Sequence, residues 1–301
     1  MKNLLLLGCG YVGKALLKEA KAKGGWRVTA LTRNPQMAEV LRHAGADRVI
    51  EAELASASWH ADVPGTWDLV ANTVSAGRGG ADAYRKSYIE GNHSLVQWAS
   101  RDDVDARTVI YTSATSVYPQ TQGELVDEAA SHQGVGENGR LLLESEAVFI
   151  EGLKAANVPH YFCLRLAGIY GPGRHYLLDR LRAGERVVAG QSDYYLNLIH
   201  RDDIGEACWF LYDNSQKAEN GVYNVSDGHF ATKREIVEWL AEHYQTVKPL
   251  FKPDEETARA KRRKNEAGKL PNRRIVSVKL MALGWRPRHP NFTDGYRVSV
   301  A

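Results

Sequence analysis

The start of the chain constrains its fold more than any other stretch. An apolar run, Leu4–Leu7, leads into the turn GCGYVG and then into a helix-like stretch, KALLKEA. This order predicts a strand, a glycine turn and a helix. Gly8 permits a tight turn, Gly10 leaves room for a pyrophosphate, and Gly13 lets the helix pack against the strand. We predict that a dinucleotide binds here, at the helix N-terminus, with a plain strand–helix turn as the alternative. The predicted contacts are Gly8, Cys9, Gly10, Tyr11, Val12 and Gly13.

The same stretch also resembles a short secretion signal that ends in a lipoprotein-type cysteine, Cys9. Its apolar region is too short, because such signals use about 7–15 apolar residues after a basic segment. No run approaches the roughly 18 apolar residues of a membrane helix. We therefore expect a soluble, cytoplasmic protein that has no membrane partner.

The composition is that of an ordinary globular protein, with 44% hydrophobic and 25% charged residues among 301. The net charge of +3 does not indicate nucleic acid as a partner. We interpret a basic run at Arg259–Lys264 as a solvated face, with a phosphate or acidic-partner contact as the alternative. The three cysteines lack C-x-x-C spacing, so we expect neither a disulfide framework nor a structural zinc site, and we name no metal ligands.

The end of the second predicted strand, Trp26–Thr32, predicts which dinucleotide binds. About 20 residues beyond the last glycine, this fold carries an acid for the ribose 2′-OH of NAD or a base for the 2′-phosphate of NADP. Arg33 stands at this distance, and neither Leu31 nor Thr32 is an acid. We predict that Thr32 and Arg33 contact the cofactor, with NADP preferred and NAD as the alternative. A plain surface arginine would also fit.

Further short runs predict strands at Arg48–Glu51, Leu69–Thr73 and Thr108–Thr112, separated by helix-like segments such as Tyr88–Ser100. Such alternation predicts a parallel sheet with helices on both faces. Ligands of this fold lie beyond the carboxyl ends of the strands. Five further residues are therefore expected near the adenine, phosphates and ribose: Glu53, Leu54, Thr73, Val74 and Ser75.

Four later motifs carry a family resemblance. In chain order they are YTSATSVY at 111–118, LRLAGIYGPG at 164–173, IHRDDI at 199–204 and VYNVSDG at 222–228. Over essentially its whole length the chain resembles the extended short-chain dehydrogenase/reductases of the NAD-dependent epimerase/dehydratase type. The resemblance implies an α/β protein, with a Rossmann-type doubly wound parallel sheet and a smaller α/β C-terminal substrate lobe. The implied domains are residues 1–168 with 195–230 for dinucleotide binding, and residues 169–194 with 231–301 for the substrate.

The chain departs from this family where the catalytic residues are expected. Family enzymes use a Ser or Thr after the fifth strand and a Tyr four residues before a Lys. The Lys lowers the pKa of the phenol that exchanges a proton with the substrate. The corresponding positions here hold Ala114, Asn138 and Leu142, and no Tyr-x-x-x-Lys occurs between Tyr118 and Tyr161. The chain therefore resembles the atypical branch of the family, which keeps the dinucleotide fold and lacks this catalytic set.

Few side chains could replace the missing groups. Ser113 and Thr115 flank Ala114 and could hold a substrate oxygen, while Tyr118 is the nearest phenol. We take these three as candidate catalytic residues, with packing as the alternative for Tyr118. Arg140 is the nearest cation and a candidate substrate contact, with a solvated or salt-bridged arginine as the alternative.

The remaining substrate candidates lie in the predicted C-terminal lobe. A Gly-Pro-Gly turn carries Arg174 and His175, and the resemblance implies that this loop binds substrate phosphates. Asn197 and His200 precede a predicted helix and complete the set of substrate candidates.

Acids near these candidates have a structural interpretation. Asp202 and Asp203 are read as the N-cap and a first-turn charge of a helix at Ile204–Tyr212. Thr232–Glu235 is read as a capping box that opens a helix at Ile236–Tyr244.

Two hypotheses about function remain. The first is an NAD(P)-binding, epimerase/dehydratase-like oxidoreductase with non-standard catalytic residues and a small hydroxylated substrate, such as a nucleotide sugar. The second is a catalytically silent dinucleotide-binding protein that senses the cofactor or holds a partner. The missing catalytic residues favour the second, and the motifs around Arg174 and His200 favour the first. Related enzymes often form homodimers, which the resemblance adds as an expectation.

Overall fold

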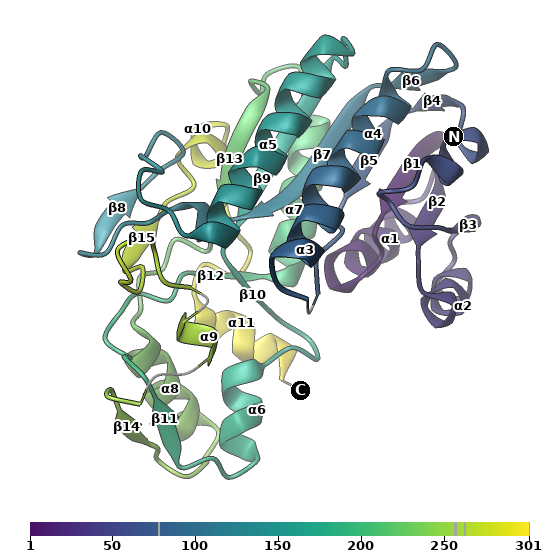
Figure 1. Cartoon of the computed structure of the whole chain (residues 1–301). Helices are drawn as coiled ribbons and strands as arrows, with labels where there is room; N and C mark the ends of the chain where they lie inside the picture. Colours follow the sequence, from purple (N-terminus) through teal and green to yellow (C-terminus); the bar gives the residue numbers. More distant parts are fainter. Residues whose placement is uncertain (78, 256–257, 262, 301) are drawn as a thin grey trace. The chain divides into compact units, whose positions relative to one another are not determined.

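The apolar runs of the chain form one seven-stranded sheet with the order β13-β9-β7-β5-β1-β2-β3 (Figure 1). The computed structural model describes residues 1–77, 79–255, 258–261 and 263–300. Strand β1 pairs in parallel with both β2 and β5, so the strand order reverses at β1. The predicted Rossmann-type doubly wound fold is confirmed. The strands are β1 (Lys2–Leu7), β2 (Trp26–Thr32), β3 (Arg48–Glu51), β5 (Leu69–Asn72), β7 (Thr108–Ala114), β9 (His160–Leu166) and β13 (Gly221–Val225).

The chain forms two compact units, and the first comprises residues 1–114, 140–165 and 204–223. Its helices cover both faces of the sheet (Figure 1). Helices α1 and α7 lie against each other at Glu19 and Gly205, and α4 and α5 at Val96 and Gly152. The helices are α1 (Tyr11–Lys23), α2 (Pro35–His43), α3 (Gly80–Tyr84), α4 (Gly91–Ala99), α5 (Glu137–Ala155) and α7 (Arg201–Asp213), of which the first turns of α5 and α7 (residues 137–139 and 201–203) are assigned to the second unit. A 3₁₀ helix (Ala57–Asp62), a π-helical segment (Arg85–Glu90) and the parallel pair β4 (Gly65–Trp67) and β6 (Val104–Ala106) complete this unit.

Burial explains why the strand sequences are continuously apolar. Leu4–Leu7 of β1 are fully buried, as expected for a central parallel strand covered by helices on both faces. The core contains Trp59 and Trp98, whose indole N–H groups donate to the carbonyls of Leu54 and Val63, each at 3.1 Å. The core therefore buries large side chains without leaving these polar atoms unpaired.

The second compact unit comprises residues 115–139, 166–203 and 224–301. It contains short parallel strand pairs and a core built from residues such as Leu178, Ile236, Leu240 and Phe292. The pairs are β10 (Gly168–Tyr170) with β12 (Leu198–His200), β11 (Val187–Ala189) with β14 (Leu250–Lys252), and β15 (Arg273–Ile275) with β8 (Glu124–Val126). The helices are α6 (Tyr176–Arg182), α8 (Lys233–His243), α9 (Ala258–Lys261), α10 (Val278–Ala282) and α11 (Phe292–Ser299), with a 3₁₀ turn at Thr115–Val117. The predicted division into a dinucleotide-binding domain (1–168 with 195–230) and a substrate-binding lobe (169–194 with 231–301) stays a prediction.

Two local predictions have opposite outcomes. The capping box is confirmed, because the Glu235 N–H donates to the Thr232 hydroxyl at 3.2 Å and the Thr232 N–H donates to the Glu235 carboxylate at 2.7 Å. The N-cap interpretation of Asp202 is wrong, because α7 begins at Arg201, one residue before Asp202. Both Asp202 and Asp203 lie in the first turn of this helix.

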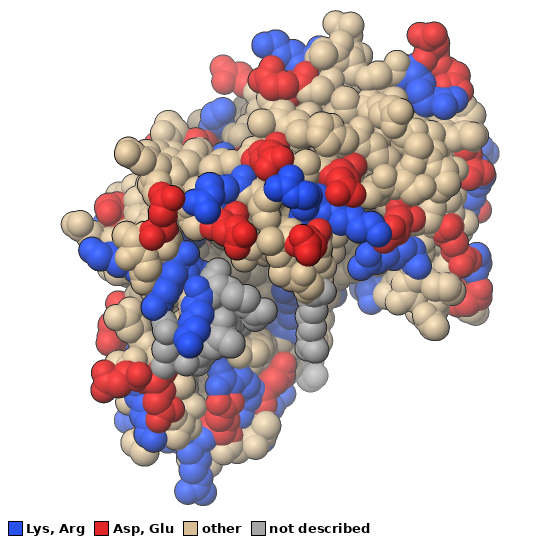
Figure 2. Space-filling view, in the orientation of Figure 1, with Lys and Arg blue, Asp and Glu red and all other residues tan. Residues whose placement is uncertain are grey.

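Charged side chains of both signs are interspersed over the face of the molecule shown in Figure 2. In the predicted basic run Arg259–Lys264, Arg262 lies outside the described residues, and Arg263 donates to the Tyr194 hydroxyl at 3.2 Å. Among the helices of the described residues, none is long and apolar enough to cross a membrane.

Candidate functional site

The three glycines between β1 and α1 have three different surroundings. Gly8 has a φ of +81°, and a Cβ added there would lie 2.4 Å from Cγ2 of Val74. A Cβ added at Gly13 would lie 2.7 Å from the carbonyl oxygen of Gly8. A Cβ added at Gly10 would meet no atom of the described residues within 4 Å. The fold therefore requires Gly8 and Gly13, whereas Gly10 keeps space open in front of the helix.

The N-terminus of α1 is suited to bind an anion. Its N-cap is Gly10, which offers no side-chain cap, and its first turn contains no acidic residue. The positive end of the helix dipole therefore lies at this turn without a side-chain cap, next to the open space at Gly10. Cys9, the second residue of the turn, is buried, and burial raises the pKa of its thiol to about 12. This thiol is therefore protonated at neutral pH and adds no charge.

A pocket of about 240 Å³ opens at this turn. Ten of the residues predicted to bind the cofactor line it: Gly8, Cys9, Gly10, Thr32, Arg33, Glu53, Leu54, Thr73, Val74 and Ser75. Tyr11, Val12 and Gly13 continue from the turn into α1 and do not line the pocket. The turn after β1 and the segment after β5 meet here because the strand order reverses between these strands.

Three charged side chains meet at one side of this pocket. Glu53 accepts from Arg33 Nη1 at 3.2 Å through Oε1, and its Oε2 lies 2.8 Å from Lys86 Nζ. Lys86 and then Arg33 lower the pKa of the Glu53 carboxyl. All three side chains are more than a third exposed, so the pairs are weak and can rearrange around a ligand.

Sequence reasoning missed Lys86 and Ser87, which also line the pocket. Both lie in the π-helical segment Arg85–Glu90, which precedes α4. No motif marked them, and a π-helical turn is rare in soluble proteins. The helix predicted at Tyr88–Ser100 begins three residues after the start of the π-helical segment, so Lys86 lies outside the predicted helix.

Buried hydrogen bonds fix the end of β5. The Thr73 hydroxyl donates to the Gly8 carbonyl, and Asn72 Nδ2 donates to Asn92 Oδ1 at 2.8 Å. Asn92 Nδ2 in turn donates to Ser145 Oγ at 2.9 Å and to the Ser145 carbonyl at 3.1 Å. These bonds connect β5 to α4 and α5, so the side of the pocket formed after β5 is held by the core.

The polar side chains near Ala114 of β7, the position where the family has a Ser or Thr, are buried and paired. The Ser113 hydroxyl donates to Glu146 Oε1 at 2.6 Å, and Arg165 Nη2 donates to Glu146 Oε2 at 2.6 Å. Leu142, at the position where the family has Lys, is also buried. This part of the first unit therefore presents a buried ion pair in place of a titrating Tyr–Lys pair.

The other catalytic candidates belong to the second unit. Tyr118 is fully buried, donates to Asn224 Oδ1 at 2.8 Å, and stacks on His132 at 5.4 Å. Thr115 is buried in the 3₁₀ turn, and Asn138 is half-buried in the first turn of α5.

The predicted substrate residues have different surroundings. Arg174 and Arg140 are exposed, and Arg140 belongs to the first unit. His175 is buried, with Nε2 at 2.9 Å from the Ser299 hydroxyl. Asn197 donates to the Arg273 carbonyl at 2.8 Å and accepts from the Ile275 N–H at 2.7 Å, so its amide holds β15 in place.

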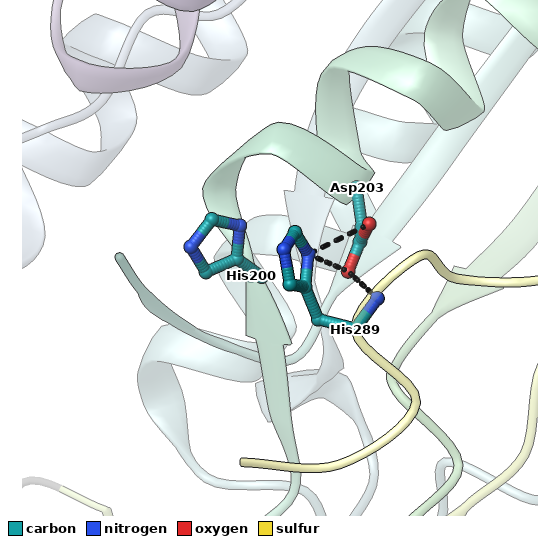
Figure 3. Close-up of side chains that lie close together, drawn as sticks. All are labelled: His200, Asp203 and His289. Carbon is teal, nitrogen blue, oxygen red and sulfur yellow. Dashed lines mark hydrogen bonds and ion pairs between the residues drawn. The ribbon is translucent and has the colours of Figure 1, made fainter. Parts of the chain in front are cut away.

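His200 lies in a buried cluster with Asp203 and His289 (Figure 3). The Asp203 carboxylate accepts from the backbone N–H groups of Arg288 at 2.9 Å and His289 at 3.1 Å, and it lies 3.1 Å from His289 Nδ1. The two imidazole rings are 4.0 Å apart. Burial and the neighbouring His289 lower the pKa of His200 to about 4, and burial raises the pKa of Asp203. Sequence reasoning missed His289, because 86 residues separate it from Asp203.

Comparisons with known proteins give one consistent result. A sequence model of the NAD dependent epimerase/dehydratase family matches residues 4–226. Protein YeeZ of Escherichia coli K12 is 32% identical over 230 residues, which make up 75% of this chain and 77% of YeeZ.

Two solved structures share the fold. One is the UDP-N-acetylglucosamine 4-epimerase of Methanobrevibacter ruminantium M1 in complex with UDP-N-acetylmuramic acid. It is 16% identical and has a TM-score of 0.81, and the match covers 99% of this chain and 96% of that one. The other is the dTDP-glucose 4,6-dehydratase of Bacillus anthracis Ames in complex with NAD. It is 13% identical and has a TM-score of 0.77, and the match covers 100% of this chain and 96% of that one.

Proposed function

We propose that this chain, which belongs to the NAD-dependent epimerase/dehydratase family, binds NADP and acts as an oxidoreductase on a small hydroxylated substrate. The observation that carries the proposal is the open space at Gly10, in a pocket that ends at an uncapped helix N-terminus. A pyrophosphate fits such a site because a helix N-terminus attracts anions and Gly10 places no side chain in the space beside it.

The preference for NADP rests on two cations of the pocket. Arg33 and Lys86 both contact Glu53, so all three side chains lie within reach of one another. A 2′-phosphate carries more charge than one carboxylate and is a good partner for a guanidinium and an ammonium together. We infer that the 2′-phosphate of NADP draws both cations away from Glu53.

The chemistry of the proposal is divided between cofactor and chain. Bound NADPH would supply the hydride, or bound NADP⁺ would accept it, and the chain would orient the dinucleotide and the substrate oxygen. Ser113, Thr115 and Tyr118 stay the proposed contacts of that oxygen. Ser113 and Tyr118 would first have to release their bonds to Glu146 and Asn224.

A nucleotide sugar is the proposed substrate class. The M. ruminantium epimerase was solved with a UDP-sugar, which supports the class by likeness of fold. Arg174, an exposed residue, is the proposed contact of its phosphates, and Arg140 stays a candidate substrate contact. His175, Asn197 and His200 stay further candidates, although Asn197 already holds β15. A homodimer is proposed on the family resemblance alone.

A second candidate function is a dinucleotide-binding protein without turnover. The buried bonds Ser113–Glu146 and Tyr118–Asn224 favour it, because both hydroxyls already have structural partners. Such a protein would bind the cofactor and no second ligand.

Thermal unfolding with each ligand separates these functions. NADPH, NADP, NADH and NAD would be tested alone and then with a panel of nucleotide sugars. A ligand at about 100 times its dissociation constant stabilises the fold by roughly 2.7 kcal/mol, which gives a measurable rise in Tm. A rise in Tm with NADPH and a further rise when one sugar is added support the oxidoreductase. A rise in Tm with the cofactor and none with any sugar supports the protein without turnover. No shift with any dinucleotide would refute both.

A further inference from the structure

Three side chains of types that ligate metal ions meet inside the second compact unit, and none of them lines the pocket at the glycine turn. One nitrogen each of His200 and His289 and one carboxylate oxygen of Asp203 lie within 4.8 Å of one another (Figure 3). All three residues are buried. We propose that they bind one divalent transition-metal ion of the zinc type.

The spacing between Asp203 and His289 already suits a tetrahedral ion. Zinc lies about 2.0–2.2 Å from its nitrogen and oxygen ligands, which puts two ligands of a tetrahedron roughly 3.3 Å apart. The carboxylate of Asp203 lies 3.1 Å from Nδ1 of His289. An ion can therefore bridge these two groups with little movement of either side chain.

His200 supplies the third ligand. Its Nδ1 accepts a hydrogen bond from the Asp202 N–H at 3.3 Å, and its Nε2 has no hydrogen-bond partner within the described part of the chain. Such a buried, half-satisfied imidazole is unusual, because buried polar atoms are nearly always paired. One ring nitrogen of His200 already lies within 4.8 Å of the donor atoms of Asp203 and His289, so a small shift can bring it to the ion.

The surroundings hold this ligand set in place. The backbone N–H groups of Arg288 and His289 orient the Asp203 carboxylate, as outer contacts do around known metal sites. The ring of Tyr170 packs edge-on against His200 at 5.3 Å. These contacts preorganise two imidazoles and one carboxylate.

The chemistry of the donors selects the ion. Two imidazoles favour Zn²⁺, Co²⁺ or Ni²⁺ over Mg²⁺ and Ca²⁺, which prefer oxygen ligands. Three protein ligands leave one position for water. Because the ligands come from residues 200–203 and from residue 289, the ion would tie these two segments together.

Metal titration of the purified full chain tests the site directly. After treatment with EDTA and its removal by dialysis, ZnCl₂ would be titrated by calorimetry and CoCl₂ by visible absorption. We expect one equivalent per chain and the intense d–d bands of a four- or five-coordinate Co²⁺ ion. His200→Asn and His289→Asn should each lower the Zn²⁺ affinity at least tenfold. His43→Asn, which removes an exposed histidine of α2, is the matched control and should leave the affinity unchanged.

Asp203 is not substituted, because its carboxylate also holds two backbone amides. The proposal is overturned if the wild-type chain takes up no stoichiometric Zn²⁺ or Co²⁺, or if both variants bind as the wild type does. Should neither variant fold, the wild-type Co²⁺ spectrum decides, since the weak bands of a six-coordinate ion contradict the site. No dinucleotide is present in these titrations, so their outcome is independent of the proposed function.

Discussion

The hydroxyl of Ser113 donates a 2.6 Å hydrogen bond to the carboxylate of Glu146, and both side chains are buried. The same carboxylate pairs with Arg165 of β9. The serine beside the empty catalytic position therefore helps to connect β7, α5 and β9. The hydroxyl next to Ala114 therefore has a structural partner, a buried ion pair, in this structure.

Substitution of Glu146 by Gln should strongly destabilise the fold. It leaves the Arg165 guanidinium buried without its carboxylate, and breaking a buried pair in this way costs about 3–5 kcal/mol. Urea denaturation measures the free energy of unfolding. The matched control is Glu144→Gln on the same helix, whose half-exposed pair with Arg85 is worth less than about 1 kcal/mol. Equal losses in the two variants would show that the buried pair adds nothing.

Gly10→Ala should weaken dinucleotide binding without unfolding the protein. The added Cβ meets no described atom within 4 Å, but it occupies the space proposed for the pyrophosphate. We expect at least a tenfold loss of NADPH affinity in a fluorescence titration and a nearly unchanged Tm. Gly13→Ala is the contrasting variant, because its Cβ would lie 2.7 Å from the Gly8 carbonyl oxygen. It should cost roughly 1–3 kcal/mol of stability, as overpacking does. Full NADPH affinity in Gly10→Ala would contradict the proposed site.

The cofactor preference should depend on Arg33 and Lys86. Replacing either by Gln removes one cation from the 2′-phosphate and should lower NADPH affinity about tenfold, with NADH affinity little changed. Glu53→Gln should act in the opposite direction, because it removes the carboxylate that competes for both cations. Arg85→Gln is the control, since Arg85 pairs with Glu144 and does not line the pocket. Equal losses for NADPH and NADH would place the 2′-phosphate elsewhere.

The fold and much of the pocket could be predicted because their signals are local. The glycine turn and the apolar run before it predicted strand β1 and helix α1 within a few residues. Lys86 could not be predicted, because a π-helical segment brings it to the pocket. His289 could not be predicted either, since only the folded chain brings it beside Asp203. Contacts across a long stretch of chain leave no periodic pattern in the sequence.

His60 should make the protein less stable in mild acid. Burial, and then the charge of Arg101, lower the pKa of His60 below its ordinary value. The unfolded chain then binds a proton at His60 more readily than the folded protein does. The free energy of unfolding therefore falls as the pH drops below about 6.5.

Urea denaturation at pH 7, 6 and 5 checks this dependence. In His60→Gln the fall in stability should be smaller than in the wild type. It should not vanish, because the pKa of His160 is lowered in the same direction. His43→Gln changes an exposed histidine and should keep the wild-type dependence. An unchanged fall in His60→Gln would show that His60 does not contribute.

Cys9 should be unreactive although it lines the pocket. Burial raises the pKa of its thiol to about 12, so only a minute fraction is thiolate at pH 8, and the thiolate is the reactive form. Cys163 and Cys208 are buried as well. We expect Ellman's reagent to modify no cysteine of the native protein within minutes and all three in guanidinium chloride. Rapid native labelling that NADPH suppresses would show that Cys9 is open to the pocket and accessible to a bound ligand.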